Sequence, residues 1–357
     1  MTPYMTTANS DQAVFDQVYE TLTVTKDDGT VAPCLAKSWK MSDDCLEYTF
    51  QLEEGVKFHN GEVMTADDVV YSFEQYLANP AKNNFVSMID KVEMVDANTV
   101  KVTLNKITPL FLVYINELPI LNKKFVEEHN GNISDVACGT GPYKLTSIDL
   151  ATSAMLERND DYRLAPAAIE KVELRYVGDR STASVQLETG DLDIMSIDPS
   201  QLVSFENNDK FTVEKVQTLK TALLAINTTV APLDNKLVRQ AMTYAVDKKS
   251  IITIAYENCA VPARLQASDT NCFGVDFSDA TDFSYNPEKA KELLAEAGYP
   301  NGLNFADYGI QMDVLGGTYM EKAAQVMQQN FADVGITIEL RNTSTPDEDA
   351  ESGNFAL

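Results

Sequence analysis

Two histidines, five cysteines and many carboxylates are the side chains of this chain that could act as bases, nucleophiles or metal ligands. His59 closes an alternating segment and His129 lies at the end of a polar one, and no GxSxG nucleophile elbow accompanies them. The HExxH pattern of zinc hydrolases and the GxxxxGK[ST] phosphate loop do not occur. We therefore interpret His59 as part of a strand-to-turn block and His129 as a solvated helix end, and we predict no catalytic residues and no enzyme activity.

The cysteines give no zinc signature, because their number is odd and no two are spaced as CxxC. Cys34 and Cys45 flank one turn, and Cys259 and Cys272 lie close together in the sequence. Each pair could form a disulfide or stay as thiols, and both states remain open.

Two further patterns resemble ligand sites only superficially. Asp191 and Asp193 bracket one leucine, but a calcium loop needs more oxygen ligands at a fixed spacing. Gly139-Thr140-Gly141 looks like part of a glycine-rich loop, yet Pro142 follows it in a strand context, which favours a structural turn. We predict no metal and no cofactor.

Composition excludes other classes of partner. The 357 residues include 54 acidic against 28 basic side chains, a formal charge of -26 that would repel nucleic acid. An apolar content of 44% is enough for sizeable cores, and the length exceeds what one core usually supports. No apolar run approaches bilayer length, and no signal peptide is visible at the start.

The elements that must position any site show clear local signals. Leu46 to Leu52 alternate apolar and polar side chains, which predicts a half-buried strand. Thr65 with Asp68 approximates a capping box before an apolar helix face. Further helices are expected to start at Ser10, Asp234 and Asn286 and to end at Gly298 and Gly335; the last of them should bury Ala323, Val326, Met327 and Phe331.

Several motifs occur in one fixed order along the chain. From Val18 to Tyr76 these are YE-L, P-LA-SW, a Y-F-L strand, V-FH-GE and TA-DVV-S, and later GTGPY, ERN-DY and NPE-AK follow. The chain thereby resembles the extracellular solute-binding proteins of family 5, the oligopeptide, dipeptide and nickel receptors of ABC importers. Family members extend beyond both ends of this sequence, so both ends are expected to be clipped.

This resemblance implies a mixed α/β fold of the type II periplasmic-binding-protein class. Such a fold has several lobes, a ligand cleft between lobes and one small inserted lobe. Lobe I would combine residues 1–38 and 159–258, lobe II would be 39–158, and lobe III would be 259–357, incomplete at its C-terminal side.

The resemblance also implies that three regions line the cleft. They are the segment leading into the first helix, the loop after the lobe II helix, and a crossing strand from Leu219 to Asn227. The residues expected to bind ligand are Thr6, Thr7, Asn9, Phe85, Leu219 and Thr221. Phe85 could instead be a core contact, and the first three a simple helix lead-in, and these alternatives remain open.

The function implied is extracytoplasmic capture of short peptides and their delivery to ABC permease subunits by hinge closure. Receptors for a nickel chelate, an opine or a sugar are alternatives within the family. A hydrolase or a sensor domain on a related scaffold is an alternative from another class. We expect a monomer in the periplasm or at the cell surface, with no nucleic-acid partner, associated with the membrane only through an upstream lipid anchor.

Overall fold

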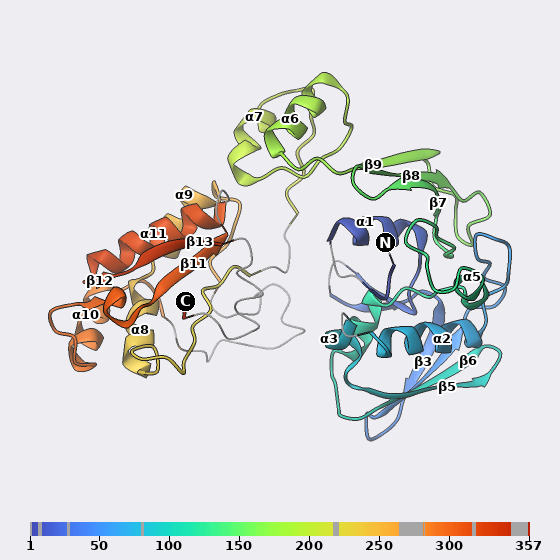
Figure 1. The fold of residues 1–357 in the computed structure, drawn as a ribbon, viewed down its shortest axis with the longest axis horizontal. Helices are drawn as coiled ribbons and strands as arrows, with labels where there is room; N and C mark the ends of the chain where they lie inside the picture. The colour runs from blue at the N-terminus through green and yellow to red at the C-terminus, as the bar shows by residue number, and fades with distance from the viewer. Residues whose placement is uncertain are drawn as a thin grey trace. The chain divides into compact units, whose positions relative to one another are not determined.

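The computed structural model describes residues 2–5, 9–26, 29–79, 82–216, 221–263, 281, 283–315, 319–343 and 356–357. The chain separates into two compact units, Met1–Thr182 and Ala183–Leu357. Each unit mixes helices with strands (Figure 1), in line with the predicted α/β class.

The first unit is built around two antiparallel sheets and a set of short helices. Its elements are α1 (Asn9–Val18), β1 (Thr23–Thr25), β2 (Val31–Pro33), β3 (Ala36–Met41), β4 (Glu47–Leu52), α2 (Ala66–Leu77), α3 (Asn83–Val86), β5 (Ile89–Asp96), β6 (Thr99–Leu104), α4 (Phe111–Tyr114), the 3-10 turn η2 (Ile115–Glu117), α5 (Lys123–Glu128), β7 (Tyr143–Asp149), β8 (Ser153–Arg158), β9 (Lys171–Arg175) and α6 (Arg180–Thr189), which runs past Thr182.

The larger sheet has the strand order β3-β4-β6-β5, and α2 packs on β5 and β6 (Figure 1). In β4, buried Tyr48, Phe50 and Leu52 alternate with half-buried residues, as the period-two pattern predicted. The second sheet, β7-β8-β9, contacts α1 through β7. A small β1-β2 ladder joins α1 to the first sheet.

The helix α2 begins at the predicted capping box. The Asp68 carboxylate accepts hydrogen bonds from the backbone N–H of Thr65, at 2.9 Å, and from its hydroxyl, at 3.1 Å. The apolar face is buried at Val69, Phe73 and Tyr76, whereas Leu77 at the end of the helix is 40% exposed.

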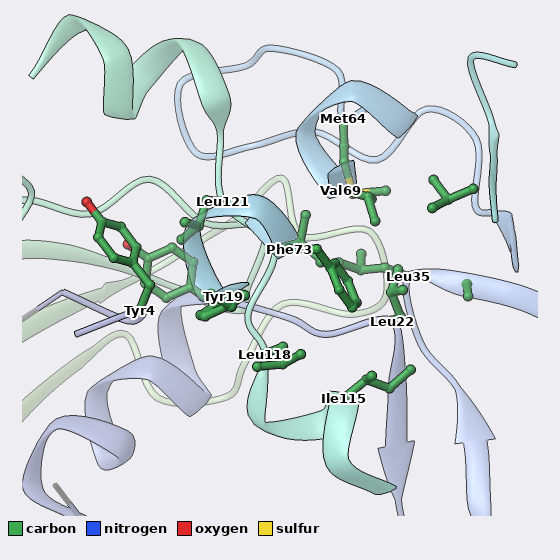
Figure 2. Packing of buried hydrophobic residues seen from close by; sticks show 14 of the residues in the cluster. Tyr4, Tyr19, Leu22, Leu35, Met64, Val69, Phe73, Ile115, Leu118 and Leu121 are labelled. Atoms are coloured by element: carbon green, nitrogen blue, oxygen red, sulfur yellow. The ribbon is translucent and has the colours of Figure 1, made fainter. Parts of the chain in front are cut away.

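The core of the first unit lies beneath α2. Figure 2 shows the side chains of Phe73, Leu22, Leu35, Ile115 and Leu118 converging at its centre. Each of these five side chains is fully buried. These side chains come from α2, from η2 and the residue after it, and from the chain before β1 and after β2, so packing fixes these segments relative to one another.

The second unit places helices over two short parallel ladders. Its elements are η3 (Pro199–Gln201), α7 (Leu202–Glu206), α8 (Lys236–Ala245), α9 (Lys248–Ala255), α10 (Pro287–Glu296), β10 (Leu303–Asn304), η4 (Phe305–Tyr308), β11 (Gln311–Leu315), α11 (Tyr319–Asp333), β12 (Ile336–Thr337) and β13 (Glu339–Thr343). Strand β10 pairs with β12, and β11 pairs with β13. The α11 helix runs alongside β11 and β13 (Figure 1).

Helix α8 packs on α10 and α9 packs on α11. The first helix of each pair belongs to the predicted lobe I and the second to the predicted lobe III. The lobe limits stay a prediction.

Most predicted helix ends agree with the structure, and two starts differ. Asn286 caps α10, with Pro287 as the first helical residue, and Gly298 and Gly335 follow helix ends at φ 99° and φ 89°. The α1 helix starts at Asn9 rather than after a Ser10 cap. The α8 cap is Asn235, not Asp234, because the Asn235 side chain reaches the backbone N–H of Leu237.

Two other expectations need correction. The described part of the predicted crossing strand, residues 221–227, has no β-ladder; there the Asn227 N–H donates to the Ala356 carbonyl, at 3.0 Å. In α11, Ala323 and Phe331 are buried as predicted, whereas Val326 and Met327 are only partly covered.

Candidate functional site

The structure describes some of the residues predicted to bind ligand and not others. Thr6, Thr7 and Leu219 lie outside the described residues. Asn9 is the first residue of α1, and Thr221 is half-buried in the irregular segment of the second unit. Phe85 lies on α3 in the first unit and has a described environment, so the site is built from there.

Phe85 forms an aromatic pair with Tyr114, the last residue of α4. The two rings meet edge to face, with centroids 6.3 Å apart and planes at 76°. Both rings are half-buried and rest on the core of the first unit. Phe85 is therefore partly packed against the core and partly exposed, and its contact with ligand stays a prediction.

A buried lysine lies beside this aromatic pair. Lys82 is 1% exposed, and its Nζ lies 5.6 Å from the centroid of the Phe85 ring. The same ammonium donates one long hydrogen bond, 3.5 Å, to the Glu117 carbonyl of η2. Burial lowers the pKa of Lys82, and the charge of Glu117 opposes that shift.

Polar contacts to β1 hold the segment that carries Tyr114 and Glu117. The Thr23 hydroxyl lies 3.0 Å from the Leu112 carbonyl and 2.6 Å from the Asn116 side chain. The Asn116 side chain also contacts the Thr25 hydroxyl. Together with the buried Ile115, these contacts give α4 and η2 a fixed position against β1.

A stripe of three side chains on α2 holds the chain that leaves η2. The Tyr76 hydroxyl donates to the Pro119 carbonyl at 2.6 Å, and the Leu121 N–H donates to Ser72 at 2.8 Å. The Asp68 carboxylate accepts from the Lys123 N–H at 3.1 Å. Residues four apart share one helix face, so Asp68, Ser72 and Tyr76 serve residues 119–123 as successive anchors.

A second polar cluster ties the end of α1 to the loop after β8. The Arg163 Nη2 donates to Glu20 Oε1 at 2.7 Å, and the Tyr162 hydroxyl donates to the same oxygen at 3.0 Å. The Glu20 side chain is 7% exposed and the Arg163 side chain 20%. Burial raises the pKa of the adjacent Cys34 to about 11, so Cys34 remains a thiol rather than a nucleophilic thiolate.

His59 is part of a backbone clamp. Its Nδ1 accepts from the Gly139 N–H at 3.3 Å, and its Nε2 lies 3.0 Å from the Gly141 carbonyl. Burial lowers the pKa of His59 to about 4, so the ring is neutral near pH 7. These contacts give His59 the structural role expected from the sequence.

The corner formed by α3, α4 and η2 brings together two half-buried rings, a buried ammonium and the backbone carbonyl that it contacts. Over the described ranges, no three His, Cys, Asp or Glu side chains gather as metal ligands would. Four of the cysteines are free thiols: Cys34, Cys45, Cys138 and Cys259. The fifth, Cys272, lies outside the described residues.

The ligand contact at Phe85, which the resemblance implied, stays a prediction, and no sequence pattern indicated that Lys82 and Tyr114 lie beside it. In the sequence, Lys82 is a charged residue that follows a predicted helix, and no local pattern shows that its ammonium is buried. Tyr114 lies in an apolar run, FLVYI, that gives no sign of its pairing with Phe85.

Comparison with known proteins gives a consistent result. Residues 30–357 match the model of the bacterial extracellular solute-binding proteins, family 5 Middle. Heme-binding protein A of Haemophilus influenzae is 32% identical over 92% of this chain, and glutathione-binding protein GsiB of Pectobacterium atrosepticum is 30% identical over 95%. The chain spans 65% and 66% of the lengths of these two relatives.

A solved structure agrees with the sequence matches. The periplasmic binding protein DppA of Helicobacter pylori, in complex with the peptide STSA, superposes with a TM-score of 0.81. It is 27% identical, and the match covers 99% of this chain and 74% of that one. The fold is therefore that of the periplasmic binding proteins. Among the described residues, no helix combines the length and the apolar character that crossing a bilayer requires.

Proposed function

This chain belongs to family 5 of the bacterial extracellular solute-binding proteins, and we propose that it captures short peptides for an ABC importer. It would act outside the cytoplasm, as a monomer held at the membrane by a lipid anchor, and would pass its ligand to permease subunits. The family match over residues 30–357 is the observation that carries this proposal.

Two relatives favour a peptide over other solutes. The DppA structure with the peptide STSA covers 99% of this chain, and the name of GsiB gives glutathione, a peptide-like thiol, as its ligand. An extended peptide suits a lobed receptor because its backbone supplies regular donors and acceptors while its side chains can vary.

The proposed mechanism is closure of lobes around the ligand. A ligand favours the closed state only to the extent that it binds that state more tightly than the open one. We propose that Phe85 provides part of the contact surface in lobe II, with Thr6, Thr7, Asn9, Leu219 and Thr221 contributing from lobe I. The lobe limits given above belong to this proposal.

Native mass spectrometry of the protein purified from rich medium tests the function. We expect a heterogeneous set of bound peptides that leave the protein unchanged. A single nickel chelate, opine, sugar or heme would contradict the peptide assignment. Products of cleavage that accumulate with time would instead indicate a hydrolase.

Truncation of Phe85 tests the aromatic wall. We expect Phe85→Ala to weaken the binding of a co-purifying peptide roughly tenfold, because about half of a phenylalanine's burial, on the order of 1.5 kcal/mol, is lost from the contact. Titration calorimetry measures the affinity, and thermal unfolding measures the stability.

Phe125→Ala is the matched control for this variant. Phe125 is also half-buried in the first unit and contacts His129, with ring centroids 4.2 Å apart. We expect its truncation to lower stability without changing affinity. An unchanged affinity in Phe85→Ala with a sharply lowered melting temperature would show that Phe85 is only a core residue.

A further inference from the structure

We propose that Asn301 is a site of spontaneous deamidation, where the side-chain amide of the folded protein is converted into an aspartyl or isoaspartyl carboxylate. The site lies in the turn between α10 and β10 of the second unit. This inference goes beyond peptide capture, because it concerns covalent chemistry of the chain itself. It follows from a comparison of three Asn-Gly dipeptides, which begin at Asn60, Asn130 and Asn301 and have different surroundings.

Deamidation needs only an asparagine, the residue after it and water. The backbone nitrogen of the following residue bonds to the side-chain carbonyl carbon, and the amide nitrogen takes the backbone proton and leaves as ammonia. Water then opens the resulting cyclic imide at either of its carbonyl carbons. One opening gives aspartate, and the other gives isoaspartate, in which the main chain runs through the side-chain carbon. A following glycine favours the attack, because it has no Cβ to hinder the close approach.

Two of the three dipeptides are held in place. The Asn60 side chain donates to the Glu62 carboxylate at 3.1 Å and accepts from the Glu62 N–H at 3.1 Å, so both ends of its amide are used. Asn130 has a φ of 52° just after α5, and the Gly131 N–H is bonded back to that helix at 2.9 Å. The Gly131 carbonyl also accepts from the Tyr4 hydroxyl at 2.8 Å. Attack at either position must first break such contacts.

Asn301 is much less restrained. Its side chain is exposed, and within the described part of the chain no residue forms a hydrogen bond with it. The Gly302 N–H donates to the Tyr299 carbonyl at 3.1 Å, which is the longest of the hydrogen bonds made by the N–H groups of the three following glycines. The Asn301 side chain can therefore turn toward the Gly302 nitrogen without losing a hydrogen bond of its own.

The backbone after Asn301 is packed closely against the start of β12. An ideal Cβ on Gly302 would lie 2.6 Å from the Gly335 carbonyl oxygen, so the two backbones are in contact there. The same carbonyl accepts from the Leu303 N–H at 2.9 Å, next to the buried pair of Leu303 and Ile336 in the β10-β12 ladder. Isoaspartate inserts one carbon into the main chain before Gly302. We therefore expect it to weaken this ladder, whereas aspartate only adds an exposed charge.

Ageing of the purified wild-type protein tests the site. The protein is incubated at mildly alkaline pH in water enriched in a heavy oxygen isotope and then mapped by peptide mass spectrometry, so that the label marks only deamidation during the incubation. We expect Asn301 to react roughly tenfold or more faster than Asn60, whose two hydrogen bonds must break first, and Asn130 to react at an intermediate rate. In concentrated urea the three rates should approach one another, because the local restraints are lost.

Variants connect the modification with the fold. Asn301→Gln removes the reactive side chain, because the longer glutamine side chain cyclises far more slowly. Asn130→Gly is the matched control, since it removes another Asn-Gly dipeptide and glycine suits the positive φ at that position. After ageing, the wild type and Asn130→Gly should contain a less stable fraction in urea denaturation followed by circular dichroism, and Asn301→Gln should not.

The outcomes decide the site and its effect separately. Equal rates at Asn301 and Asn60 in the folded protein overturn the site, and so does an Asn301 that reacts only in urea. Isoaspartate at Asn301 that leaves the urea transition unchanged overturns the effect on β10 and β12. The rates come from the wild-type protein, so they decide the site even if a variant does not fold. None of these measurements involves a ligand, so the result does not depend on peptide capture.

Discussion

The Gly139→Ala variant should fail to form the native first unit. An ideal Cβ at Gly139 would lie 2.0 Å from the Val18 carbonyl oxygen and 2.8 Å from the Tyr19 ring. The nearest atom is backbone, and His59 holds Gly139 from the other side through its own N–H and ring. We expect the free energy of unfolding to fall by more than about 3 kcal/mol. This exceeds the usual cost of overpacking and is a large part of the stability of one domain.

Gly178→Ala is the control for that change. The atoms nearest to a Cβ there would belong to the Tyr176 side chain, at 3.7 Å, which is ordinary contact. We expect the soluble yield and the urea midpoint of Gly178→Ala to equal those of the wild type, while Gly139→Ala is found largely in the insoluble fraction. A soluble Gly139→Ala with an unchanged midpoint would show that the backbone of Val18 can move away.

The Arg163→Met variant should be strongly destabilised by the loss of one ion pair. It removes the guanidinium that neutralises Glu20, and Glu20 would keep a charge on a side chain that is 7% exposed. Removing one partner of a buried pair costs about 3–5 kcal/mol, because the remaining charge is desolvated without compensation. Urea denaturation monitored by circular dichroism measures this loss.

Two neighbouring variants set the scale for that loss. Arg158→Met removes a pair with Asp160, whose side chain is 75% exposed, and should cost less than about 1 kcal/mol. Tyr162→Phe removes one hydrogen bond to Glu20 and should cost about 1 kcal/mol. If Arg163→Met costs no more than Arg158→Met, the Glu20 charge is compensated by groups other than Arg163.

Local patterns predicted the parts of the fold that depend on local physics. The alternation in β4, the capping box at Thr65 and the Asn286-Pro287 start of α10 each depend on neighbours within a few residues. The resemblance supplied the fold class, because ordered motifs carry information that periodicity does not.

Sequence patterns could not supply two kinds of feature: the choice between adjacent candidate residues, and contacts between distant segments. The α8 cap falls at Asn235 rather than Asp234 because the turn before it fixes which side chain reaches the Leu237 N–H. The hydrogen bond of the Lys82 ammonium to the Glu117 carbonyl of η2 joins residues 35 positions apart. Exposure and pairing of such groups are properties of packing, which no short window of sequence contains.

The polar stripe on α2 determines how precisely the aromatic wall can be placed. A strand in a sheet can slip by two residues and keep the same side chains on each face. The chain from Pro119 to Lys123 is held instead by three unlike anchors: a hydroxyl donor, a hydroxyl acceptor and a carboxylate. A slip would pair each anchor with the wrong backbone group. The Glu117 carbonyl and the Tyr114 ring therefore have one registered position, and insertions or deletions should be tolerated poorly between Tyr114 and Lys123.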